Sequence, residues 1–318
     1  MLRRIILGSY LLGAAGAAFA QIGAPQLGWV ADGTHIRPVY GIPASAAVGA
    51  AVDIQDFLRV AASASRNYVL VCAIDTGIVS VYQPETGSTP VNGAGIAPDS
   101  IVLSPGGSAA ALWFSSINQV QIVTGLPDAP SIRQLDASFL VSSTGSGPDA
   151  LALSDDGAWL AGSWLTGVYA FGPNGEVSRL PIEDRVSALA FFPLTHDIAA
   201  ASLAGLQRVT GIGNFIQMSA LAAFADSSPP AAAVAVTSDN KIVIAVDGGG
   251  SITAVQLESG AATTIDCGCS PEGLFPIGSS AFRLTSLQGG AFKLFDAALG
   301  EVLFAPLALI QSAEGAAQ

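Results

Sequence analysis

The sequence repeats one pattern of short apolar segments about every 40 residues, and this repeat limits the folds open to the chain. Each unit has an apolar strand, a turn rich in Ser, Pro, Asp and Gly, a second apolar strand, another turn, and a third strand ending near a glycine. The first strand and its turn recur at 57–67, 101–107, 151–157, 188–193, 234–240 and 274–278. Repeats of this length predict an array of small units that are stable only when they pack on one another.

The remaining strands of each unit follow at corresponding positions. Second strands are expected at 68–73, 109–114, 159–163, 198–202, 242–246 and 282–286. Third strands, several of them alternating apolar and polar residues, are expected in segments that run to a glycine, at 79–87, 120–125, 168–175, 252–260 and 292–300. Fourth strands are expected at 179–182, 263–266 and 302–305. Strict alternation is the pattern of a half-buried strand, and the glycines after the third strands suit tight hairpin turns.

Six four-stranded antiparallel units predict an all-β fold, a β-propeller. Before the first unit, residues 27–33 and 35–41 have the pattern of a third and a fourth strand without a first and second. This fragment either forms an incomplete seventh blade or pairs with the other end of the chain to fasten the ring. Seven blades are favoured over six. The expected domain spans residues 21–310, followed by a short tail at 311–318.

Short motifs in these units resemble those of a known superfamily. The third strands end in Glu-Thr-Gly at 85–87 and Glu-Ser-Gly at 258–260, and turns read Ser-Pro-Gly-Gly at 104–107 and Ser-Asp-Asp-Gly at 154–157. Over residues 55–306 the chain thus resembles the bacterial secreted propellers of the YVTN, lactonase-like and WD40-like kind. The resemblance implies the fold. No Trp-Asp dipeptide occurs, so the WD40 structural tetrad has no counterpart, and the metal and catalytic residues of the lactonase-like enzymes find no match.

The first 20 residues have the layout of a cleaved signal peptide. Arg3 and Arg4 precede an uncharged apolar stretch at 5–17, and Ala18-Phe19-Ala20 places small residues where a signal peptidase reads them. Cleavage is expected before Gln21, which predicts a secreted or periplasmic protein. No later segment is a run of 18 apolar residues free of turn residues, so the mature chain is expected to have no membrane span.

Composition restricts the partners. The chain is 51% hydrophobic and 11% charged, which is far too apolar for a disordered protein. Its formal net charge is −12, and an acidic protein is repelled by nucleic-acid backbones and anionic membrane surfaces. A protein of the cell envelope or the extracellular space, or a small ligand, is therefore the expected partner.

Acidic residues recur in one class of loop. In a four-stranded blade, the loops between the second and third strands lie on the same face of the ring as the linkers between blades. That face would carry Asp75, Asp99, Asp149, Asp184, Asp226, Asp247 and Glu272. Converging carboxylates could bind Ca²⁺, another divalent ion or a cationic ligand. The alternative is that each is a solvated turn residue with local hydrogen bonds. No other cofactor is expected.

The cysteines and histidines give weaker signals. Cys72 lies in an apolar run, which favours a buried free thiol, whereas Cys267 and Cys269 lie in a turn and could form a local disulfide, stay free or help to hold a metal. His35 and His196 are expected in exposed turns, and no HExxH motif or P-loop occurs. The sequence favours a non-catalytic propeller that binds a protein or other ligand through loops on one face. The alternative is a lactonase-like, metal-dependent hydrolase or lyase with its site in the central channel.

Overall fold

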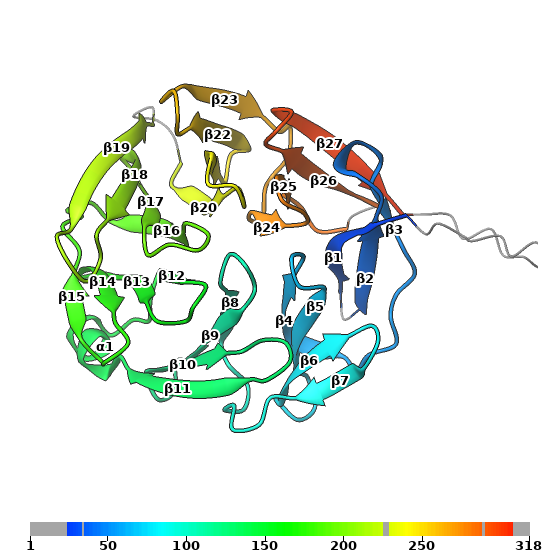
Figure 1. Ribbon diagram of the computed structural model, residues 1–318, viewed down its shortest axis with the longest axis horizontal. Coiled ribbons are helices and arrows are strands. Elements are labelled where there is room, and N and C mark those ends of the chain that lie inside the picture. The colour runs from blue at the N-terminus through cyan, green and yellow to red at the C-terminus, as the bar shows by residue number, and fades with distance from the viewer. Residues whose placement is uncertain (1–23, 34, 225–228, 288–289, 308–318) are drawn as a thin grey trace, which may run out of the picture.

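The computed structural model describes residues 24–33, 35–224, 229–287 and 290–307, and it confirms the seven-bladed β-propeller (Figure 1). The expected signal peptide at 1–20, the tail at 311–318 and Asp226 lie outside the described residues. Blade 1 has three strands: β1 (Gln26–Asp32), β2 (His35–Tyr40) and β3 (Ala47–Val48). A single turn of 3-10 helix, Pro43–Ser45, joins β2 to β3.

The other six blades are four-stranded antiparallel meanders in which each strand pairs with its neighbours in the sequence. Blade 2 comprises β4 (Phe57–Ser63), β5 (Tyr68–Ala73), β6 (Val79–Gln83) and β7 (Gly87–Pro90). Blade 3 comprises β8 (Ser100–Leu103), β9 (Ala109–Phe114), β10 (Gln119–Thr124) and β11 (Ser131–Asp136). Blade 4 comprises β12 (Ala150–Leu153), β13 (Leu160–Trp164), β14 (Gly167–Phe171) and β15 (Val177–Arg179). Blade 5 comprises β16 (Val186–Phe191), β17 (Ile198–Ser202), β18 (Gly205–Thr210) and β19 (Gln217–Ala223). Blade 6 comprises β20 (Ala231–Val236), β21 (Ile242–Asp247), β22 (Ser251–Gln256) and β23 (Ala262–Asp266). Blade 7 comprises β24 (Phe275–Pro276), β25 (Ala281–Arg283), β26 (Ala291–Asp296) and β27 (Glu301–Pro306). One short helix, α1 (Ser138–Thr144), lies in the linker between blades 3 and 4.

Blades 2 to 7 each place their first strand at the centre of the ring and their fourth at the rim (Figure 1). The connections therefore fall on two faces. We call the face with the loops between second and third strands and the linkers between blades the loop face. We call the opposite face, with the turns between first and second strands and between third and fourth strands, the turn face.

The second strands of blades 2 to 7 are almost wholly buried because a neighbouring blade covers each side of the sheet. Every residue of β5, β9 and β17 is buried. A strand covered on both sides reads as a continuous apolar run, and alternation is lost. Small residues, such as the alanines at 109–111 and 199–201, let adjacent sheets approach closely.

The hydrophobic core is divided among the blade interfaces. The described residues form seven clusters of buried apolar side chains, and each cluster draws on two adjacent blades. The cluster between blades 4 and 5, for example, joins Trp159 and Val168 to Phe191 and Val209. Each blade thus depends on both neighbours to bury its two faces.

Blade 1 closes the ring and differs from the sequence expectation. Its hairpin was expected to supply a third and a fourth strand, yet β1 occupies the innermost position, where Gln26 and Leu27 line the central channel. A Cβ built on Gly28 would lie 3.2 Å from the Cβ of Ala64 and 3.3 Å from the Cα of Ile277, which follow the inner strands of blades 2 and 7. The beginning of β1 thus lies beside the ends of those strands, so β1 runs in the opposite direction.

Apolar packing on both sides and one β-bridge fasten this blade to its neighbours. Val30, Val39 and Val48 pack against Phe292 and Leu294 of blade 7, and Trp29 packs with Phe57 and Val69 of blade 2. Beyond β27, Leu307 forms a parallel bridge with Val48 of β3. The fragment is therefore an incomplete blade that also pairs with the other end of the chain.

One fourth strand lies earlier than expected. Strand β15 covers Val177–Arg179, whereas residues 179–182 were expected to be the strand. Pro181 lacks the backbone N–H that would continue the ladder. Leu180 and Ile182 are instead buried in the cluster between blades 4 and 5.

Hydrogen bonds link neighbouring blades across the turn face. The Ser65 hydroxyl and the Arg66 guanidinium of blade 2 donate to the Gly106 carbonyl of blade 3. The Asp155 carboxylate of blade 4 accepts from the backbone N–H groups of Gly106 and of Leu194 in blade 5. Two further contacts continue the series: Asn240 Nδ2 donates to the Pro193 carbonyl and Ser238 N to the Ser279 carbonyl. The turns at the channel mouth are therefore held in place by adjacent blades.

The turn of blade 4 gives a test of this packing. Gly157 has a φ of +66°, and a side chain there would collide with Thr124 of blade 3. We expect Gly157→Val to lower the free energy of unfolding by about 2 to 4 kcal/mol, the sum of left-handed strain and overpacking. Gly175 has a φ of +83° with open space around it, so Gly175→Val should cost about 1 to 2 kcal/mol. Equal losses in urea unfolding would show that the contact between blades is unimportant here.

Candidate functional site

Two of the expected acidic residues on the loop face have strong local partners. The Asp99 carboxylate accepts a hydrogen bond from the backbone N–H of Ser115 at 2.6 Å. Hydrogen bonding from Ser115 holds the pKa of Asp99 below its ordinary value, and the nearby Arg59 adds to that lowering. Asp149 forms an ion pair with Arg185 at 2.8 Å, which raises the pKa of that guanidinium.

Asp247 and Glu272 also have local partners. Asp247 accepts from the backbone N–H groups of Gly249 and Ser251, each at 2.9 Å, and so stabilises its own hairpin loop. Glu272 accepts from the Ser286 hydroxyl at 2.6 Å and lies 3.8 Å from Arg283. Burial lowers the pKa of Arg283 to about 10, an effect that Glu272 opposes.

The remaining expected residues, Asp75 and Asp184, are exposed to solvent. Within the described part of the chain, no group of three or more His, Cys, Asp or Glu side chains is arranged to hold a metal ion. The structure thus places four of the six in local hydrogen bonds or ion pairs and brings no group of them together around one point.

Large aliphatic side chains are exposed on the same face. Their exposure runs from 42% for Ile78 to 67% for Ile96. They occupy the loops between second and third strands in four consecutive blades, together with one linker. We call this set the apolar arc: Ile74, Ile78, Ile96, Ile117, Leu165 and Leu203. Exposed apolar side chains that gather on one face of a protein are typical of interaction surfaces.

The arc is supported by ordered backbone. The Ala97 N–H donates to the Gly77 carbonyl at 2.8 Å, and the Ile96 side chain lies against Gly77, whose φ is +68°. A residue with a Cβ at position 77 would displace Ile96. Asp99, through its bond to Ser115, orders the loop that presents Ile117. One role of the acidic residue is thus to hold an apolar loop tip in place.

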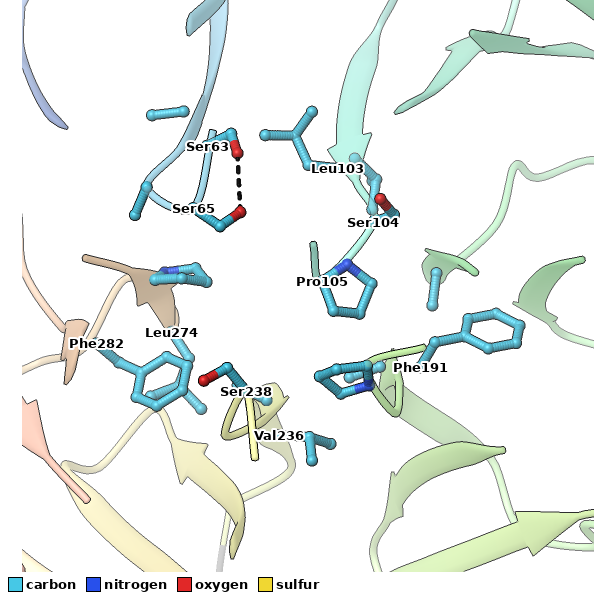
Figure 2. Close-up of a pocket in the computed structure, with 18 of the residues that line it drawn as sticks. Ser63, Ser65, Leu103, Ser104, Pro105, Phe191, Val236, Ser238, Leu274 and Phe282 are labelled. Carbon is cyan, nitrogen blue, oxygen red and sulfur yellow. Dashed lines mark hydrogen bonds between the residues drawn. The ribbon is translucent and has the colours of Figure 1, made fainter. Parts of the chain in front are cut away.

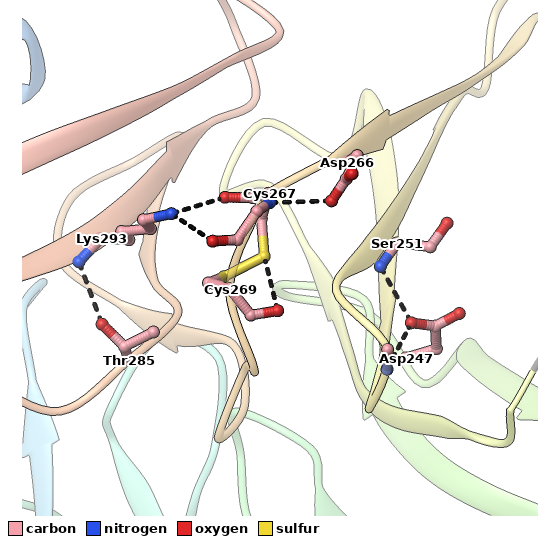
Figure 3. The surroundings of a disulfide bond; sticks show 9 residues. Asp247, Ser251, Asp266, Cys267, Cys269, Thr285 and Lys293 are labelled. Atoms are coloured by element: carbon pink, nitrogen blue, oxygen red, sulfur yellow. Dashed lines mark hydrogen bonds between the residues drawn. A yellow bond between two sulfur atoms is a disulfide. The ribbon is translucent and has the colours of Figure 1, made fainter.

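The cysteines have distinct states. Cys267 and Cys269 are joined by a disulfide, and the Lys293 ammonium donates to the carbonyls of Cys267 and Gly268 at 2.9 and 2.6 Å (Figure 3). Cys72 is a buried free thiol, and burial raises its pKa.

The two histidines lie on different blades. His35 is exposed at the start of β2, and His196 Nε2 lies 2.8 Å from Asp156 of the neighbouring blade. Partial burial raises the pKa of Asp156, but hydrogen bonds from Ser154, Ala158 and His196 outweigh this and leave the pKa lowered.

A central cavity of about 470 Å³ lies towards the turn face. Its wall is built from the inner strands and the turns that follow them, with residues such as Leu103, Phe191 and Val236 (Figure 2). Serines 63, 65, 104, 238 and 279 provide hydroxyl groups. Of the described residues that line the cavity, none has a charged side chain. The cavity therefore lies near the face opposite the expected acidic site.

Sequence reasoning missed both the apolar arc and the cavity. The arc had a detectable signal, since isoleucine and leucine at hairpin-loop tips depart from the polar residues usual there. The cavity had none, because its volume depends on how the inner strands approach across the ring.

Comparisons with known proteins give the fold. No family model matches the chain, and no curated protein matches it. Two solved structures of AztD from Citrobacter koseri, one of them the apo form, are each 14% identical to it and match 88% of this chain and 82% of that one. Their TM-scores are 0.57 and 0.55. The β-propeller domain of Cps50 (Swd1) from Myceliophteria thermophila is 14% identical over 63% of this chain and 65% of that one, with a TM-score of 0.46.

The Asp99 contact gives a pH test. A folded pKa below the unfolded value of about 3.9 stabilises the fold above that pH and ceases to do so as pH falls through the folded pKa. We expect Asp99→Asn to be less stable than the wild type at pH 7, because a neutral amide oxygen is a weaker acceptor, and the difference should shrink below about pH 4. Urea unfolding from pH 7 to pH 3 measures this, with Asp75→Asn as the control for charge removal. A difference that does not change with pH would contradict the assignment.

Proposed function

We propose that this protein is an exported, non-catalytic propeller that binds a protein partner through the apolar arc of its loop face. The observation that carries the proposal is the exposure of six large aliphatic side chains on that face, in four consecutive blades. Covering such side chains removes apolar surface from water, which is the main driving force of protein association.

The chemistry of the partner follows from what surrounds the arc. Asp75 and Asp184 are exposed on the same face, and the whole chain has a formal net charge of −12. A complementary surface would have an apolar centre and a rim of Lys and Arg side chains, because such a rim would speed encounter and select against acidic proteins.

Export rests on the first 20 residues of the sequence. The resemblance to secreted YVTN and lactonase-like propellers supports the same compartment, and the partner would then be a protein of the cell envelope or the extracellular space. Across the described residues, no helix has the length and apolar character needed to cross a membrane.

We expect the mature protein isolated from its natural source to begin at Gln21, as measured by intact mass and N-terminal sequencing. A mature chain that keeps Arg3 and Arg4 would contradict export by signal cleavage.

Partner binding can be tested with matched variants. We expect wild-type protein, immobilised and exposed to envelope extract, to enrich specific proteins that Ile96→Ser/Ile117→Ser/Leu165→Ser no longer enriches. The substitutions remove apolar surface without removing any acidic residue, and quantitative mass spectrometry measures the loss.

The control carries the same kind of change on the other face. Leu194→Ser/Phe215→Ser removes two side chains that are even more exposed, from turns of blade 5 on the turn face. This variant should retain the enriched proteins, and added salt should weaken their capture. The same enrichment by all three proteins would overturn the assignment of the loop face.

A further inference from the structure

The central cavity is separate from the loop-face site, and its wall restricts what it could hold. We propose that it is a binding site for a small, uncharged and largely apolar molecule that enters from the turn face. This inference does not depend on the proposed function, because different residues on a different face carry it.

The size of the cavity suits a ligand. Binding pockets for small molecules have volumes of about 300 to 1,000 Å³, and this cavity has about 470 Å³. All seven blades contribute to its wall. Six inner strands bring similar apolar residues to it, and β1 adds Leu27. The cavity is therefore enclosed by the whole ring and is not a gap at one interface.

Two phenylalanine rings support the wall from behind. The inner strand of blade 7, β24, is two residues long, and Phe282 of the second strand lies next to the cavity (Figure 2). Phe191 lies next to it in blade 5. These residues are only 2% and 1% exposed, so they present little ring surface to the cavity, and the surrounding blades fix their positions. A wall of fixed apolar groups is preorganised, which lowers the cost of ordering on binding.

The absence of charged side chains among the described residues of the wall disfavours the binding of ions. An ion moved into the cavity would lose hydration, and the described side chains of the wall supply no countercharge. Anions would in addition meet a protein of net charge −12. Uncharged molecules pay neither cost.

Hydroxyl groups at the mouth could hold a polar end of the ligand. Ser238 and Ser279 are exposed, and their backbones are joined by a hydrogen bond from Ser238 N to the Ser279 carbonyl at 3.1 Å. Within the described residues, neither side-chain hydroxyl has a protein partner. Ser65, in contrast, already donates to the Gly106 carbonyl at 2.9 Å. The expected ligand thus has an apolar body and a hydroxyl or carbonyl group at one end.

Primary alcohols from hexanol to decanol, titrated into the mature protein by calorimetry, test this inference. We expect affinity to rise about fourfold for each added methylene until the cavity is filled, because each buried methylene contributes a constant hydrophobic increment. Carboxylates of equal chain length should bind at least tenfold more weakly. Equal binding of alcohols and carboxylates, or no measurable binding of any alcohol, would overturn the proposal.

Two variants locate the binding. Ser238→Trp would place a ring across the cavity mouth and should reduce decanol affinity at least tenfold. Ser88→Trp makes the same change on the exposed outer strand β7 and should leave the affinity unchanged. Melting temperatures confirm that both variants are folded. An equal reduction in both would show that decanol binds elsewhere, whereas capture of proteins through the loop face should survive in both variants and would report separately on the proposed function.

Discussion

Packing between adjacent blades is the interaction on which the whole structure depends. No single sheet can bury both of its faces, and the hydrophobic core formed by the described residues consists of seven clusters, each shared by two blades. The ring must therefore close, because an open end would expose one complete apolar face. The N-terminal hairpin supplies that closure by packing against blade 7 on one side and blade 2 on the other.

The two faces of the ring differ in how their connections are held. On the turn face, residues such as Asp155 and Asn240 hydrogen-bond to neighbouring blades and hold the turns around the channel mouth. On the loop face, loops such as those of Ile117 and Leu165 are hairpin tips that project from single blades. Rigid turns suit a preorganised cavity, whereas projecting tips suit contact with a large partner.

Most of the acidic residues expected on the loop face have structural roles. Asp99 and Asp247 accept hydrogen bonds from backbone N–H groups of nearby loops, and Asp149 pairs with Arg185. Their charges nevertheless remain on the face that carries the apolar arc. Local bonding explains their position in the fold, and the proposed preference for a basic partner rests in part on their field.

The repeat, the strands and most turns could be predicted from the sequence, because these depend on local properties. An apolar run such as residues 68–73 indicates a buried strand, and a glycine such as Gly157 indicates a turn. The count of six units plus a fragment led to the prediction of seven blades. Tertiary structure decided the rest. The direction of β1 depends on how the chain ends meet, and the strand at 177–179 depends on Pro181 and on the buried places of Leu180 and Ile182. The cavity arises from the radius of the ring. The exposure of Ile96 arises from the position of its side chain against Gly77. A local pattern cannot encode these features, because each depends on the distance between residues that are remote in the sequence.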